Sequence, residues 1–145
     1  MPTVSDVAKY ILEARGETSA LKLQKLLYYA QAWTLAWDDA PLFKEKIEAW
    51  ANGPVIPALY QKHKGRFSLK PSDIAGDSSK ITKAHQANID KVLSYYGDKT
   101  PQWLSDLTHM EAPWLETRAE ANLKDGERGN AAIPLERIQN YYANL

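Results

Sequence analysis

Apolar residues recur at spacings of three and four along several stretches of the chain, which is the pattern of amphipathic helices. The first such stretch covers residues 3–15. Thr3 and Asp6 stand three residues apart at its start and match an N-terminal capping pair, and Gly16 is typical of a helix end. We therefore predict a first helix over this stretch.

The longest periodic stretch runs from Ala20 to Trp37, with Ser19 in position to cap it. Its apolar stripe is made by Leu23, Leu26, Leu27, Ala30, Trp33 and Trp37. Three further large side chains widen the stripe: Tyr28, Tyr29 and Leu35. Three polar residues are expected to lie outside it: Lys22, Lys25 and Gln31. A stripe this wide predicts the central helix of the domain.

Weaker signals follow this helix. Residues 38–41 contain two aspartates and a proline and are expected to end it, and residues 42–50 alternate only weakly, which favours a short strand or hairpin. Asn52-Gly53-Pro54 is predicted to be a turn, and residues 67–80 a loop or an edge strand. Further helices are predicted over residues 55–64, 81–96, 100–110 and 113–121, and from residue 134 onward.

These elements predict a mostly α protein of one compact domain over residues 1–145. About six helices would lie around the central helix (Ala20–Trp37), with a small β element near residues 42–50. The length is typical of one domain, and no repeat or linker divides the chain. Five aromatic side chains are expected to share one core around the central helix: Trp33, Trp37, Trp50, Tyr60 and Trp103.

Eighteen basic residues balance eighteen acidic ones, so the chain has no formal net charge at pH 7. Nucleic-acid-binding proteins normally show a basic excess, because contacts to phosphates supply most of their affinity. The balance therefore argues against direct nucleic-acid binding. Cysteine is absent, which excludes disulfides and thiolate metal sites. Without a leader-like start or an apolar run of about 18 residues, we expect a soluble, cytoplasmic protein with no membrane partner.

The sequence offers little that could carry out a reaction. No two of its three histidines have the four-residue spacing of a helical zinc site, and no nucleophile turn or phosphate-binding glycine loop occurs. We therefore predict no catalytic, cofactor-binding or metal-binding residue and no enzymatic activity. A small hydrolase or nucleic-acid enzyme is the weakest of three hypotheses, and His63, His109 and Glu111 are the residues that would test it.

The densest basic cluster lies at the end of the helix predicted over residues 55–64, just before Phe67: Lys62, His63, Lys64 and Arg66. We predict that this cluster binds a partner, because arginine makes bidentate contacts with carboxylates and phosphates. The alternative is a solvated helix end, where the helix dipole favours cations. The tyrosine doublets at 28–29 and 141–142 offer a second candidate surface, since helical neighbours point about 100° apart and one of each pair is expected to stay partly exposed.

Several sequence blocks stand out by their order and spacing. They are LKLQKLLYYAQ at residues 21–31, PLF at 41–43, EAWANGPVIPALY at 48–60 and THMEAPW at 108–114. Together they resemble the Panacea (SocA-like, GepA-like) domain family, over about residues 4–118. The resemblance implies an antitoxin of a two-gene toxin–antitoxin system, of the kind often carried by phages and mobile elements. Such a protein binds a cognate toxin protein directly and catalyses nothing.

The resemblance also implies that the motif residues serve the fold. The expected roles are the turn for Gly53 and Pro54, packing for Trp50, Tyr60 and Trp114, and loop-side hydrogen bonds for His109 and Glu111. The residue pattern itself places Pro57 and Pro113 at helix starts. One relative in this family is an adaptor that delivers its toxin to a cytosolic protease. The second hypothesis is therefore a proteolytic adaptor, or a phage-encoded anti-defence protein that binds a host or toxin protein without catalysis. No helix-turn-helix or basic arm is added to the domain, which argues against autoregulation by this chain.

Overall fold

The computed structural model describes residues 1–145. Its α-helices are α1 (Val4–Arg15), α2 (Ala20–Asp38), α3 (Pro57–His63), α4 (Lys83–Tyr96), α5 (Pro101–His109), α6 (Ala112–Glu120) and α7 (Leu135–Ala143). Its short strands are β1 (Thr18–Ser19), β2 (Glu48–Trp50), β3 (Gly53–Val55) and β4 (Ser68–Leu69). Two short 3-10 helices, η1 (Pro71–Asp73) and η2 (Ser78–Lys80), precede α4.

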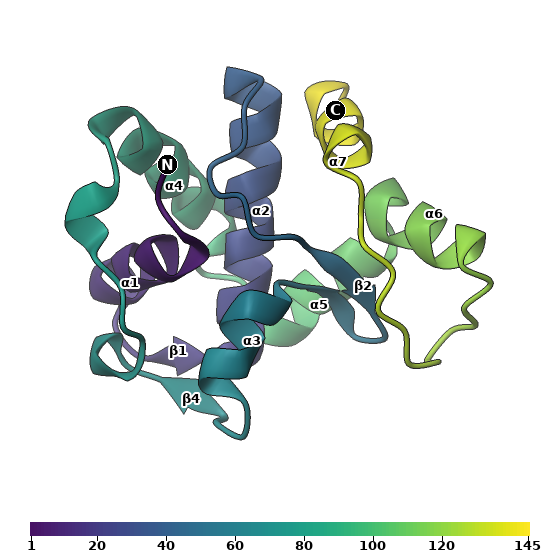
Figure 1. The fold of residues 1–145 in the computed structure, drawn as a ribbon, viewed down its shortest axis with the longest axis horizontal. Helices are drawn as coiled ribbons and strands as arrows, with labels where there is room; N and C mark the ends of the chain where they lie inside the picture. Colours follow the sequence, from purple (N-terminus) through teal and green to yellow (C-terminus); the bar gives the residue numbers. More distant parts are fainter.

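Helix α2 stands at the centre of the molecule, as the sequence predicts (Figure 1). Helices α1 and α4 flank it on one side, and α7 lies on the other side with α6 beyond it. Side chains are buried along most of its length, from Leu23 to Leu35. The mostly α fold is confirmed, with six α-helices besides the central helix α2.

The helix starts follow the local sequence. Thr3 Oγ1 accepts a hydrogen bond from the Asp6 N–H, and the Asp6 carboxylate accepts one from the Thr3 N–H, which confirms the predicted capping pair. Ser19 caps α2 through its hydroxyl. Thr82 caps α4, and this helix therefore begins at Lys83, two residues after the predicted start.

The small β element is a hairpin that lies further along the chain than predicted. Strands β2 and β3 pair antiparallel, with Trp50 opposite Gly53. Ala51 and Asn52 therefore make the turn, and Gly53 and Pro54, which were expected to form it, belong to β3. Gly53 has φ +120°, a conformation that glycine adopts readily and L side chains avoid. The hairpin therefore depends on glycine at the position that follows its turn.

Two further pairings join segments that are distant in sequence. Residues 131–133 lie along the free edge of β2, where the Ala49 N–H donates to the Ala131 carbonyl at 2.8 Å. The Ile133 N–H donates to the Ile47 carbonyl at the same distance. Strands β1 and β4 pair antiparallel, so the stretch predicted as loop or edge strand contains a short strand. No local alternation of side chains could predict these pairings, because each depends on a remote partner.

Two polar residues of α2 expected outside its stripe are fully buried, namely Lys25 and Gln31. The Gln31 side chain binds the backbone after the helix: its Oε1 accepts from the Leu42 N–H at 2.7 Å, and its Nε2 donates to the Phe43 carbonyl at 2.7 Å. Neighbouring elements cover α2 on the polar positions as well as on the apolar ones. The predicted placement of these two residues was therefore wrong.

The aromatic core also differs from the prediction. Trp37 is 45 % exposed and Trp103 39 % exposed, so neither belongs to the core. Trp33, Trp50 and Tyr60 are partly buried. The buried aromatic rings are instead Tyr28, Tyr29, Phe43, Tyr96, Trp114 and Tyr142. Both members of the first tyrosine doublet are therefore buried, contrary to expectation, whereas the second keeps Tyr141 partly exposed.

Trp33 and Trp37 provide a matched pair for testing this arrangement. The Trp33 indole N–H donates to the Tyr96 hydroxyl at 2.9 Å, and its ring packs against Tyr142. Trp33→Ala should therefore lower the free energy of unfolding by about 2 kcal/mol, below the loss for a fully buried Trp. Trp37→Ala should lower it by less than about 1 kcal/mol. Chemical denaturation of both variants measures the difference, and equal losses would contradict the assignment of these two rings.

Candidate functional site

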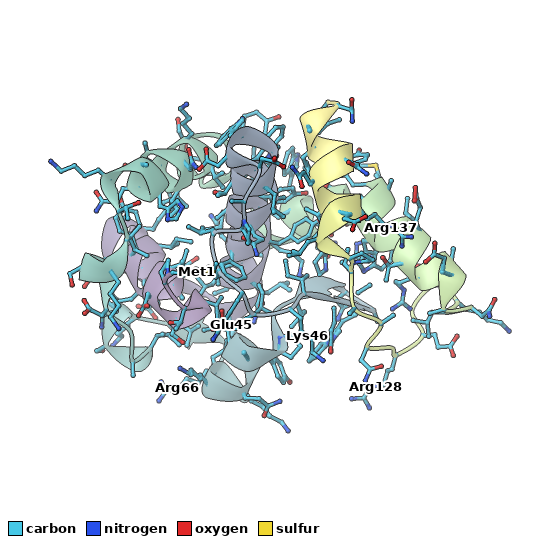
Figure 2. The ribbon with its side chains drawn as sticks, turned by 45° about the horizontal axis from the view of Figure 1, so that its top comes forward. Met1, Glu45, Lys46, Arg66, Arg128 and Arg137 are labelled. Atoms are coloured by element: carbon cyan, nitrogen blue, oxygen red, sulfur yellow. The ribbon has the colours of Figure 1, made fainter.

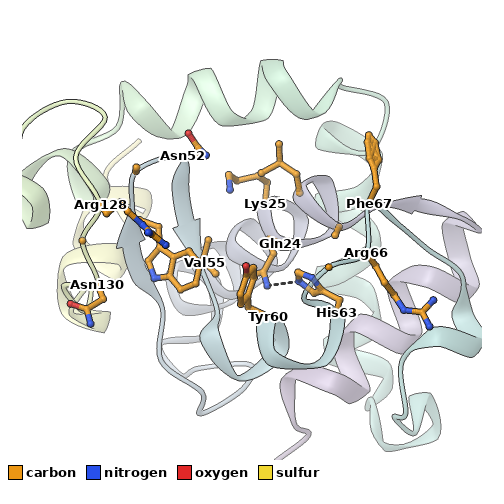
Figure 3. A pocket seen from close by; sticks show the side chains of 16 residues that line it. Gln24, Lys25, Asn52, Val55, Tyr60, His63, Arg66, Phe67, Arg128 and Asn130 are labelled. Carbon is orange, nitrogen blue, oxygen red and sulfur yellow. Dashed lines mark hydrogen bonds between the residues drawn. The ribbon is translucent and has the colours of Figure 1, made fainter.

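A pocket opens between the start of α2, the β2–β3 hairpin and α3 (Figure 3). Its volume is about 900 Å³. The loop that follows α3 contributes Arg66 and Phe67, and the segment before residue 131 contributes Arg128 and Asn130. The pocket thus combines the start of α2, the stretch from the hairpin to Phe67 and the segment before residue 131, which only the tertiary fold brings together.

The α2–α3 wall of the pocket holds a buried histidine. The side-chain amide of Gln24 accepts from the Ile56 N–H at 2.8 Å through Oε1, which leaves its NH₂ group to face His63 Nε2 at 3.0 Å. That ring nitrogen must therefore accept the hydrogen bond, as in a neutral imidazole. Burial also lowers the pKa of His63. His63 is an uncharged part of the pocket wall.

Lys25 lies beside Gln24 and is fully buried. Its ammonium donates to the Pro54 carbonyl at 3.2 Å, the only hydrogen bond that its side chain makes. Burial lowers the pKa of Lys25 to about 8, because removal from water destabilises the charged form. Gly53 leaves room for this side chain, since a Cβ atom there would stand 2.6 Å from Lys25 Cε.

An aromatic wall and two arginines complete the pocket. The rings of Trp50 and Tyr60 meet edge to face with centroids 4.9 Å apart. Phe67 is 77 % exposed, so its ring is free to contact another molecule. Arg66 lies at one end of the pocket and Arg128 at the other (Figure 3), and both project outward at the same edge of the molecule (Figure 2).

The four residues of the predicted basic cluster do not form one patch. Lys62 donates to the Ser5 hydroxyl at 2.7 Å, and Lys64 is exposed. His63 is 4 % exposed, which corrects its expected place on an exposed surface. Arg66 lines the pocket while one of its guanidinium nitrogens lies 3.0 Å from the Asp73 carboxylate. Of the four, only His63 and Arg66 belong to the pocket.

Several motif residues meet around the hairpin. Trp114 donates its indole N–H to the Trp50 carbonyl at 2.8 Å, and the His109 ring lies against Trp114 with centroids 4.1 Å apart. The two ring nitrogens of His109 face the carbonyl oxygens of Ser105 and Ala51, at 2.6 and 3.1 Å. Pro57 is the first residue of α3, and Pro113 lies in the first turn of α6. These contacts hold the hairpin against α5 and α6.

Glu111 lies in the core and does not line the pocket. Its Oε1 accepts hydrogen bonds from the hydroxyls of Tyr29 at 2.7 Å and Tyr142 at 2.8 Å. Burial raises the pKa of this carboxyl group, and the two tyrosine hydrogen bonds oppose that effect. The carboxylate thus joins α2 to α7 through a pair of hydroxyls.

Sequence reasoning missed Gln24, Lys25, Arg128 and Asn130 as pocket residues. For the first two, the wide aromatic stripe of α2 was a usable signal, since a helix covered on most sides also buries polar side chains. Nothing in the local sequence marks Arg128 or Asn130. No group of three or more acidic, histidine or cysteine residues is placed to hold a metal ion. No helix is both long and apolar enough to cross a membrane.

Comparison with protein families matches residues 23–115 to the model described as antitoxin SocA-like, Panacea domain. This range holds Gln24, Lys25, the hairpin and α3, and it ends before the segment that contributes Arg128. Searches of curated proteins and of solved structures returned no match. The family description supports an antitoxin role in general terms. The chain belongs to the SocA-like, Panacea-domain antitoxin family.

Proposed function

We propose that this protein is the antitoxin of a two-gene toxin–antitoxin system and that it neutralises its cognate toxin by binding it directly. Family membership supports the general role. The observation that carries direct binding is the open pocket, which combines an aromatic wall with cationic ends. Tryptophan, tyrosine and arginine are the residue types that most often dominate binding energy at protein interfaces.

The contact surface that we propose is the pocket and its edge. Arg66 keeps the role predicted from the sequence, and Arg128 joins it from a distant segment. Lys62 and Lys64 flank this surface from the end of α3. An acidic face of a toxin would complement these charges. We also infer that the protein acts in the cytoplasm, where both products of such a gene pair are made.

The second candidate is the adaptor or anti-defence protein, and one separate surface favours it. Exposed aromatic rings alternate with lysines across α2, α4 and the start of α5: Lys91 Nζ lies 5.2 Å from the Trp37 ring centroid, and Lys99 Nζ lies 4.8 Å from that of Trp103. No residue of this strip lines the pocket. An adaptor must hold two proteins at once, for example a toxin and a cytosolic protease, and therefore needs two surfaces.

Co-expression with the neighbouring reading frame tests both candidates. The antitoxin proposal predicts that this protein restores growth and co-purifies with the toxin, whose half-life stays unchanged or lengthens. A shortened toxin half-life would favour the adaptor. If the toxin remains harmful and the two products do not associate, the proposed function is wrong.

Two matched double variants locate the contact surface. Arg66→Gln with Arg128→Gln should weaken toxin binding by about tenfold and reduce its salt dependence, because charges at an interface edge act through long-range attraction. Lys62→Gln with Lys64→Gln removes the same charge outside the pocket and should have a smaller effect. Isothermal titration at two salt concentrations measures both. A larger loss in the lysine pair would move the interface to the end of α3.

A further inference from the structure

Lys25 is an unusual residue for a protein core. Lysine is almost never fully buried unless a partner balances its charge. Its ammonium can donate three hydrogen bonds, but it makes one, to a neutral carbonyl group of Pro54. No ion pair of the structure includes Lys25. The protein therefore holds a cation in a nearly dry place and supplies no anion for it.

The pocket beside Lys25 has an unbalanced charge. None of its sixteen lining residues is aspartate or glutamate, whereas three are lysine or arginine: Lys25, Arg66 and Arg128. Arg66 is paired with Asp73, which lies outside the lining, so Lys25 and Arg128 are the lining cations without an ion-pair partner. Figure 3 shows Lys25 between the two arginines, with Gln24 next to it. Such a pocket attracts an anionic group toward the buried ammonium.

We propose that the pocket receives an acidic side chain of the bound toxin, whose carboxylate pairs with the ammonium of Lys25. This inference rests on the proposed function and names the chemistry of the contact. The aromatic wall of Trp50 and Tyr60, together with the exposed ring of Phe67, provides apolar contacts for the residues that flank the acidic one. These faces favour a protein segment over a free small carboxylate.

Binding requires a modest movement of Lys25. Its ammonium has no exposed surface, although the side chain lines the pocket. The flexible stem can rotate once the single hydrogen bond to Pro54 is broken. A hydrogen bond between two charged groups then replaces one to a neutral carbonyl, and charge-assisted bonds are roughly twice as strong. Replacement of the Pro54 hydrogen bond by one to a carboxylate therefore favours the bound state, because water is largely excluded from this part of the protein.

The test uses the toxin encoded beside this protein, titrated into the wild type and into Lys25→Met. Methionine keeps the length and apolar character of the stem and removes the charge. The variant should bind at least about 30-fold more weakly, as expected when one partner of a buried charge pair is lost. Thermal denaturation of the free variant confirms that it is folded, and the same substitution at an exposed lysine, Lys44→Met, serves as the control.

A second measurement works on the wild-type protein and does not depend on the variant. Isotope labelling of lysine allows the pKa of Lys25 to be followed by NMR, with Lys25→Met identifying its signal. Complex formation should raise this pKa from about 8 toward its ordinary value, because a carboxylate favours the charged form. A purely structural lysine would keep its value. Propionate at the same concentration as the toxin provides the free-carboxylate comparison.

The outcomes separate the inference from the function on which it rests. If Lys25→Met binds and neutralises the toxin as the wild type does, the carboxylate contact is wrong while the antitoxin role stands. An unchanged pKa of Lys25 in the complex leads to the same conclusion. If propionate raises the pKa as fully as the toxin does, the ligand is a free carboxylate and the protein-segment assignment is overturned. If the wild type does not bind the toxin, both proposals fail.

Discussion

Glu111→Ala is expected to lower the free energy of unfolding by about 3–4 kcal/mol, the largest loss that we predict for a single substitution in this protein. The change removes the acceptor of the Tyr29 and Tyr142 hydroxyls and leaves a cavity between α2 and α7. An unsatisfied buried hydroxyl and a cavity each destabilise the folded state. Denaturant titration followed by tryptophan fluorescence measures the loss.

Glu111→Gln is the matched control. Both tyrosine hydroxyls donate to the same oxygen, Oε1, which the glutamine amide can supply equally well. This variant should therefore stay within about 1 kcal/mol of the wild type near neutral pH. It should also neutralise the toxin fully. If Glu111 were a general acid or base, this replacement would abolish its catalytic function, because an amide does not exchange the proton. A stable Glu111→Gln protein without activity would instead support the enzyme hypothesis.

The pH dependence of stability provides an independent check on Glu111. Burial raises its folded-state pKa above the ordinary value of 4.5. At pH values between 4.5 and the raised folded-state pKa, the folded protein binds more protons at Glu111 than the unfolded one does. In this interval the group therefore makes the free energy of unfolding fall as pH rises. Its stabilising contribution is present below pH 4.5 and is lost above the folded-state pKa. Glu111→Gln should remove this part of the slope, and an identical slope in both proteins would contradict the assignment.

Lys25→Met is expected to act in the opposite direction and to raise the free energy of unfolding by about 2–3 kcal/mol at pH 7. The replacement of a buried charge by an apolar side chain of similar shape is often stabilising. The pKa of Lys25 falls from 10.5 to about 8, and each unit corresponds to about 1.4 kcal/mol. Loss of the hydrogen bond to Pro54 offsets part of the gain.

The gain should disappear in alkaline solution. Between pH 8 and 10.5 the unfolded chain binds more protons at Lys25 than the folded protein does. The wild type therefore becomes more stable relative to Lys25→Met as pH rises through this interval. Melting temperatures of the two proteins at pH 7 and pH 10 measure the effect. A variant that is less stable than the wild type at pH 7 would show that the lysine serves the fold and would weaken its assignment to partner binding.

The burial of Lys25 could not be predicted from the sequence of α2. On a helix wheel, Lys25 falls among the polar residues of α2, and solvent exposure is the ordinary outcome for such a residue. Gln31 misleads in the same way, because its amide binds backbone groups of residues 42 and 43. Periodicity reports the apolar face of a helix, but it does not report how many neighbours cover the other faces.

The sequence predicted the site less well than the fold. It singled out His63 and Arg66, which do line the pocket, but it treated them as parts of one exposed patch with Lys62 and Lys64. The direction of each side chain at the end of a short helix depends on what packs against that helix. His63 turns inward because Gln24 of α2 offers it a hydrogen bond, and this contact spans 39 residues.

The sequence by itself determined the mostly helical class, the central helix and the capped starts of α1 and α2. These starts depend on contacts between residues three positions apart, such as Thr3 with Asp6 and Ser19 with Lys22. Its motif blocks also determined the family, which the match over residues 23–115 confirms. Only the tertiary structure decided the strand pairings, the exposure of Trp37, the burial of Lys25 and the pocket. Each of these depends on segments that are distant along the chain, and a packed neighbour determines whether a side chain meets water or protein.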